Sequence, residues 1–201
     1  MLADASVARN FAVLGWTDEL ITLAGGSLSI AHGVLGMDCD EVGEIERIRA
    51  AFDNESMRSP GSPMASAATA ALVGLDDLIR RRSKDVTVLA PTEVEMAVAI
   101  RLQDPREGTW RRSLGVRARR LDAGEAVSIA IATVRGLTFA SDDDDGRAAY
   151  EALAGIRHRW TLDLVQEAVA QGLLTDTDAR RGYRLLRERY RFWGQPWPLD
   201  D

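Results

Sequence analysis

The sequence predicts an α/β fold, a three-layer α/β/α sandwich in which a central parallel sheet of four to five strands lies between helices. Three observations predict it. Short apolar runs typical of buried strands alternate with longer segments whose apolar residues recur at helical spacing. The chain has 201 residues, 46% of them hydrophobic, which is enough for one full core. No segment repeats. We therefore expect a single domain over residues 1–201.

The first part of the chain predicts the element order βαβα. An apolar opening at residues 2–7 predicts the first strand, and a helix follows to about residue 23, where Gly25 and Gly26 end it. Residues 27–31 alternate apolar and small polar side chains and predict the second strand. One face of the next helix carries four apolar residues: Val42, Ile45, Ile48 and Phe52.

Residues 53–85 look like a helical and loop insertion into this order. Proline, glycine and serine residues over 53–65 predict a long loop. The alanine-rich stretch at 67–82 predicts a helix, because Leu72, Leu75 and Ile79 follow one face.

The alternation resumes after the insertion. Residues 86–89 predict a third strand, and Thr92 with Glu95 three residues later forms a capping box that begins a helix. Asp104 and Pro105 end that helix.

The C-terminal part predicts two more strands and four helices. A nearly apolar helix at 124–135, closed by Gly136, leads into a buried strand at 137–140. A short helix at 146–153 precedes a weak last strand at 157–160. Two helices follow: one that Thr161 caps and Gly172 ends, and one whose apolar face carries Ala179, Tyr183, Leu186 and Tyr190.

Composition excludes several classes of protein. The single cysteine, Cys39, cannot form an internal disulfide, which favours the cytoplasm. No stretch of about 18 apolar residues could span a membrane, and the N-terminus lacks the pattern of a secretory signal. The net charge of −6 disfavours non-specific binding of nucleic acid by the molecule as a whole.

Arginines nevertheless cluster in one segment. The chain has one lysine, Lys84, and 24 arginines, and residues 106–120 contain six arginines with a single acid, Glu107. Such a patch can follow a phosphate backbone or can pair with acids on a neighbouring helix, and the charge pattern leaves both open. The patch consists of Arg106, Arg111, Arg112, Arg117, Arg119 and Arg120.

Acidic residues follow the ends of two predicted strands. Asp4 ends the first strand, residues 142–145 are four aspartates after the strand at 137–140, and Glu125 opens a helix toward the same edge. Converging carboxylates repel one another unless a cation neutralises them, and oxygen ligands without clustered His or Cys favour Mg²⁺ or Mn²⁺. Taken singly, each acid could equally be a helix cap or part of a solvated turn.

Three stretches of the chain carry a common resemblance. Residues 2–7 place an aspartate on a first strand before an apolar helix, and residues 121–147 contain a Gly-Glu helix start, a glycine, a buried strand and a Thr-Asp-Asp-like turn. Residues 161–193 supply two closing helices and an aromatic terminus. With these features the chain resembles the PIN-domain nucleases, and more closely the toxin-like branch related to VapC.

The resemblance implies a metal-dependent endoribonuclease, a hydrolase that cuts RNA phosphodiesters with a carboxylate-bound Mg²⁺ or Mn²⁺ ion. It implies four metal ligands: Asp4, Glu125, Asp142 and Asp143. The family places a further catalytic acid after its second strand in a Val-x-x-Glu-like motif. Here Val34 is followed by Leu-Gly-Met and Asp38, so Asp38 is the implied acid, with Asp40 and Glu41 as competitors.

The same resemblance implies partners. The substrate is RNA, and a small antitoxin protein would occlude the acidic cleft; a homodimer is also possible. The expected RNA-binding residues come from the basic patch: Arg111, Arg112, Arg117, Arg119 and Arg120.

Two other functions compete with an active nuclease. One is a catalytically degenerate PIN fold that binds protein or RNA, which the uncertain second acid suggests. The other is a phosphatase similar to the haloacid dehalogenases, which also begin with an aspartate on a first strand. That class normally has a second aspartate two residues later, and this chain has Ser6 there.

Overall fold

The structure, a computed structural model, describes residues 1–36, 42–58, 60–82, 84–104, 121–156 and 158–190. In these residues four parallel strands form one sheet in the order β3-β2-β1-β4. The strands are β1 (Leu2–Ala3), β2 (Leu28–Ala31), β3 (Val86–Leu89) and β4 (Phe139–Ala140). The predicted α/β class with a parallel central sheet is confirmed.

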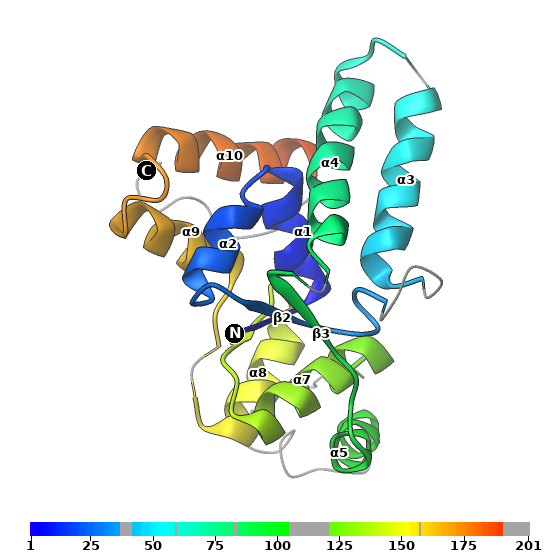
Figure 1. The fold of residues 1–201 in the computed structure, drawn as a ribbon, viewed down its shortest axis with the longest axis vertical. Coiled ribbons are helices and arrows are strands. Elements are labelled where there is room, and N and C mark those ends of the chain that lie inside the picture. The colour runs from blue at the N-terminus through cyan, green and yellow to red at the C-terminus, as the bar shows by residue number, and fades with distance from the viewer. Residues whose placement is uncertain (37–41, 59, 83, 105–120, 157, 191–201) are drawn as a thin grey trace.

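Helices cover both faces of the sheet, which gives the three layers in Figure 1. One layer contains α1 (Ala5–Val13), α2 (Thr17–Leu23), α4 (Pro63–Arg80), α9 (Thr161–Ala170) and α10 (Asp176–Arg189). The other contains α5 (Glu93–Gln103), α7 (Ala123–Arg135) and α8 (Asp144–Ala154). The long helix α3 (Glu44–Arg58) lies antiparallel to α4, and this pair projects from the body of the molecule (Figure 1). No helix in the described ranges is long and apolar enough to cross a bilayer.

The strand order of the sheet reverses at β1. Strands β2 and β3 extend it to one side of β1, and β4 pairs with the other side, with Ala3 opposite Ala140. The backbone N–H of Asp4 continues this pairing and donates to the carbonyl of Ala140 at 2.8 Å. The residues after β1 and β4 therefore meet at the topological switch point, where open α/β sheets bind ligands.

The predicted loop at 53–65 is wrong, because most of it is helical. Helix α3 continues to Arg58, and α4 begins at Pro63 after only a short turn. Ser62 caps α4 by accepting a hydrogen bond from the Ala65 N–H at 3.0 Å. Proline is compatible with a first helical turn because its missing N–H would have no partner there, so Pro63 starts a helix rather than breaking one.

Smaller differences have equally local causes. The single helix predicted up to residue 23 is two helices, because the chain turns at Gly15 with a φ of +73°. The predicted last strand at 157–160 is reduced to one bridge between Arg159 and Ala140, with Arg157 outside the described residues. The N-cap position of α9 is occupied by Trp160 rather than Thr161, and Trp160 makes no side-chain capping hydrogen bond. The capping box of α5 and the left-handed Gly136 that ends α7 are confirmed.

Candidate active site

An acidic cavity of about 200 Å³ opens at the switch point. Its walls come from the ends of β1 and β4 and from the first turns of α1, α3 and α7. Arg9 is the one basic residue among the lining residues that the structure describes, and Ala5, Ser6 and Ile48 complete the wall. The cavity carries five carboxylates: Asp4, Glu44, Asp122, Glu125 and Asp143.

Asp4 occupies the N-cap position of α1 without capping it. Its side chain makes no capping hydrogen bond; instead Oδ2 accepts hydrogen bonds from the hydroxyls of Ser141 at 3.1 Å and Ser6 at 3.4 Å. Burial raises the pKa of Asp4 to about 6, and the nearby charge of Glu44 adds to this, while hydrogen bonds from Ala5 and Ser141 lower it. The ionised form of Asp4 is therefore costly in the protein alone.

Glu125 is the most strongly perturbed acid of the cavity. It lies three residues after Asp122, the N-cap of α7, whose Oδ1 accepts a hydrogen bond from the Glu125 N–H at 2.7 Å. Burial, followed by the charges of Asp143 and Asp4, raises the pKa of Glu125 to about 9. Its Oε1 is buried and has no hydrogen-bond partner.

The backbone of Gly146 closes one side of the Glu125 carboxylate. A Cβ atom built on Gly146 would lie 2.0 Å from Oε1 of Glu125, which is far inside van der Waals contact. Only glycine leaves room for the carboxylate in its present position.

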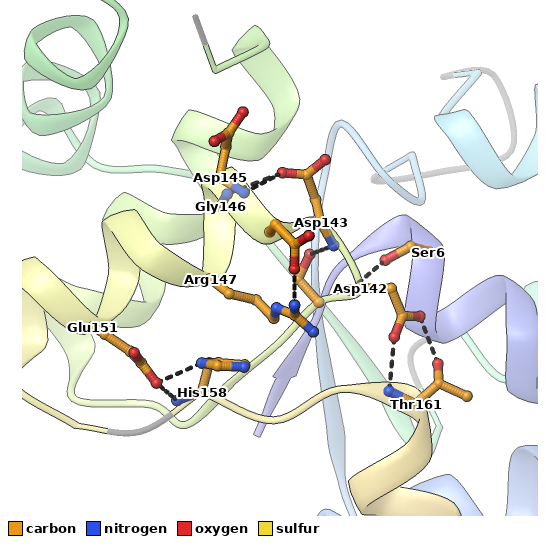
Figure 2. A network of polar contacts seen from close by, with 11 residues as sticks. Ser6, Asp142, Asp143, Asp145, Gly146, Arg147, Glu151, His158 and Thr161 are labelled. Carbon is orange, nitrogen blue, oxygen red and sulfur yellow. Dashed lines mark hydrogen bonds and ion pairs between the residues drawn. The ribbon is translucent and has the colours of Figure 1, made fainter. Parts of the chain in front are cut away.

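Asp143 joins the cavity from the end of β4. Figure 2 shows its side chain at the start of α8, where Oδ1 accepts hydrogen bonds from the N–H groups of Asp145 at 2.9 Å and Gly146 at 3.0 Å. Asp143 is thus the N-cap of α8 and also a lining residue of the acidic cavity.

Asp142 points away from Asp143, toward α9 (Figure 2), and does not line the cavity. Its carboxylate accepts hydrogen bonds from the Thr161 N–H at 2.8 Å, the Thr161 hydroxyl at 2.6 Å and the Asn10 amide at 2.9 Å. Its own N–H donates to the Ser6 hydroxyl at 3.0 Å. The predicted pair of metal ligands is thus divided, with Asp143 in the cavity and Asp142 between the helices.

Two cavity acids, Glu44 and Asp122, were not predicted as site residues. Burial raises the pKa of Glu44, as does the charge of Asp122. The one signal for Glu44 in the sequence is its place one helical turn before the apolar Ile48, which puts the two on the same side of the helix. The acids predicted near this helix, Asp38, Asp40 and Glu41, all precede it.

Several predicted residues lie outside the described part of the chain. These are Asp38, its competitors Asp40 and Glu41, and the whole basic patch, including Arg111, Arg112, Arg117, Arg119 and Arg120. Their predicted roles stay predictions.

The donor set fits a hard divalent cation in its chemistry. The described cavity wall offers carboxylate and hydroxyl oxygens and contains neither of the described histidines; His158 instead contacts Glu151 at 2.5 Å. The unpartnered Oε1 of Glu125 is an acceptor without a donor. As they stand, no three His, Cys, Asp or Glu side chains in the described ranges are close enough together to hold one ion. The fit is one of ligand type and charge.

No family model, no curated protein and no solved structure matches this chain. What the protein does has to follow from its own residues.

Proposed function

We propose that this protein is a metal-dependent endoribonuclease of the PIN type, which hydrolyses RNA phosphodiesters with Mg²⁺ or Mn²⁺. One observation carries the proposal: five carboxylates from four places in the fold (the ends of β1 and β4 and the starts of α3 and α7) line one cavity at the switch point, with Arg9 as the only described cation in its wall. Uncompensated carboxylates destabilise a fold, so a site of this composition is explained by a cationic ligand.

The cavity acids differ in their proposed roles. Asp4, Glu125 and Asp143 would hold the cation, and Glu44 would supply the further acid that the resemblance implies at Asp38. When bound, the ion would lower the pKa of a water molecule and neutralise charge on the scissile phosphate. Ser141 and Ser6 donate to Asp4 and orient its carboxylate.

Asp142 serves as a positioning residue in this proposal. Its three hydrogen bonds to Asn10 and Thr161 connect the end of β4 to α1 and α9. Its N–H also orients the Ser6 hydroxyl, which donates to Asp4. Asp142 therefore acts on the cavity through Ser6.

The resemblance extends the proposal to the toxin of a toxin–antitoxin pair that works in the cytoplasm. Expression of the chain alone should then arrest growth, and Asp4→Asn should relieve the arrest. Growth arrest that persists in Asp4→Asn would contradict a nuclease toxin.

The direct test is cleavage of single-stranded RNA by the purified chain, after removal of metal with EDTA and re-addition of Mg²⁺ or Mn²⁺. Asp4→Asn and Glu125→Gln should each abolish cleavage and leave the far-UV circular dichroism unchanged. The matched control is Asp18→Asn, an exposed acid of α2 that pairs with Arg81 and lies outside the cavity. Cleavage in EDTA, or full cleavage by Asp4→Asn, would refute the proposal. Binding of RNA without cleavage by the wild type would favour the degenerate, binding-only PIN fold.

A further inference from the structure

A second hollow adjoins the acidic cavity, between α3, α4 and α10. It measures about 390 Å³, and Arg9 and Ile48 line both hollows. We propose that this groove binds the base of a nucleotide that neighbours the scissile phosphate, with Arg9 contacting the phosphate between them; this rests on the proposed ribonuclease function. The apolar part of the groove consists of Ala51, Phe52, Met64, Ala67, Ala68 and Tyr190.

Phe52 supplies a fixed aromatic surface in the groove. Its ring meets the Tyr190 ring edge-on, with centroids 5.8 Å apart and planes at 79°. Tyr190 is itself anchored, because its hydroxyl donates to the Ala67 carbonyl on α4 at 3.0 Å. An aromatic ring held in place stacks on a base at a small cost in side-chain entropy, and proteins bind unpaired bases in this way.

The polar residues of the groove favour a base over an apolar peptide side chain. Glu55, Glu188 and Arg189 line it; carboxylates accept hydrogen bonds from the amino and imino groups on the edge of a base, and a guanidinium donates to its carbonyl oxygens and ring nitrogens. An apolar side chain would leave these carboxylates without such donors. A nucleobase combines the flat apolar face that Phe52 requires with the polar edge that the carboxylates require.

Arg9 is placed at the junction of the two hollows. Asn10 Oδ1 accepts hydrogen bonds from its Nε at 3.1 Å and its Nη2 at 2.8 Å, which fixes the guanidinium. An arginine between a base groove and a carboxylate cavity can neutralise the backbone that runs from one to the other.

The test measures RNA affinity separately from cleavage. Ca²⁺ takes oxygen ligands as Mg²⁺ does, but with longer bonds and looser geometry, so it can replace Mg²⁺ in a binding assay. Two fluorescent probes of equal length are titrated: a single-stranded RNA, and a ribose-phosphate chain that lacks bases. Phe52→Leu should weaken binding of the RNA about tenfold, because one stacked base is lost. It should leave binding of the base-free chain unchanged.

Arg9→Gln should affect both probes, unlike Phe52→Leu. It should weaken both probes and reduce the salt dependence of binding by about 0.7, because one phosphate contact on a single strand is lost. Met57→Ala is the control for Phe52, since Met57 is an exposed apolar residue of α3 outside the groove.

The outcomes separate the two proposals. If the wild type cleaves RNA and Phe52→Leu binds both probes like the wild type, the groove proposal fails and the nuclease stands. Equal weakening of both probes by Phe52→Leu would also overturn it, because a lost base contact cannot affect a chain without bases. If the wild type shows neither cleavage nor Mn²⁺ binding, the proposed function fails and the groove proposal fails with it. Thermal melting of each variant confirms that it is folded.

Discussion

Glu95 and Glu125 occupy the same position at the start of their helices, and their pKa values are shifted in opposite directions. Each lies three residues after the N-cap of its helix, Thr92 for α5 and Asp122 for α7. The Glu95 carboxylate accepts hydrogen bonds from Arg135 Nε at 2.6 Å and from the Thr92 N–H at 2.6 Å. Its hydrogen bond with Arg135 lowers the pKa of Glu95 to about 2, whereas burial raises the pKa of Glu125 to about 9.

The difference teaches that burial alone does not decide the state of an acid. Glu95 is 1% exposed and yet fully compensated, because Arg135 and the capping box satisfy its carboxylate. Glu125 has a backbone cap but no cation, and its nearest charges are other acids. A buried carboxylate paired with a cation stabilises the framework, whereas a carboxylate whose neighbours are other acids marks a candidate site.

The largest expected effect is on catalysis. For the ribonuclease that we propose, Glu125→Gln should lower kcat for RNA cleavage by at least about a hundredfold, because the proposed site loses one of its charged ligands. Glu95→Gln should leave kcat within about twofold, since Glu95 lies outside the cavity. Steady-state cleavage assays at saturating Mg²⁺ compare the two. Equal losses in both variants would mean that cavity and ion pair do not differ in function.

The second effect is on stability, and it concerns the compensated acid. Arg135→Met leaves the Glu95 carboxylate buried without its cation and should lower the free energy of unfolding by about 3 kcal/mol. The double variant with Glu95→Gln should recover part of this loss. Urea unfolding of the single and double variants measures the coupling, and an unchanged midpoint in Arg135→Met would show that the ion pair contributes nothing.

The pH dependence of stability should report the same pair. Because the pKa of Glu95 is lower in the folded protein than in the unfolded chain, its stabilisation is present above about pH 4.5 and is lost as the pH falls toward 2. We expect this contribution to be about 2 kcal/mol, since Arg135 is 31% exposed and partly screened by solvent. Unfolding experiments between these pH values should show the loss in the wild type and a smaller one in Glu95→Gln.

The smallest effect has the opposite sign. In EDTA, Glu125→Gln should stabilise the protein by about 1 kcal/mol at neutral pH, because the Glu125 carboxyl, whose pKa is raised to about 9, must take up a proton when the chain folds and glutamine need not. Adding Mn²⁺ should stabilise the wild type more than the variant, since only the wild type keeps the full ligand set. Thermal melting with and without Mn²⁺ measures both; destabilisation of the metal-free variant would argue that Glu125 is a structural acid.

The sequence predicted which strand and helix ends form the site better than it predicted which side chains pair there. Strand ends and capping patterns are local, so the sequence alone predicts Asp4, Glu125 and Asp143 at one edge of the sheet. The partner of Glu95 could not, because Arg135 is 40 residues away and the two meet only when α5 packs on α7.

Neighbouring aspartates show the same limit at shorter range. Asp142 and Asp143 are two of four consecutive aspartates, and the sequence does not distinguish their roles. Their side chains separate because Thr161, at the start of α9, donates hydrogen bonds to Asp142. Glu44 was missed for a related reason, because a first-turn acid is usually a dipole partner and only the packing of α3 turns it toward the cavity.

The parallel ladder between β1 and β4 has a consequence for how the protein can change. Leu2 and Ala3 pair with Phe139 and Ala140, and the Asp4 N–H continues this pairing to the Ala140 carbonyl, so the ladder spaces the strands that lead to Asp4 and Asp143 at about 4.8 Å. This spacing is fixed once β1 and β4 have paired. Insertions or deletions at the turn between α3 and α4 can therefore change the length of the projecting pair without altering the spacing of β1 and β4, whereas a change in the first turn of α3 would displace Glu44 from the cavity wall.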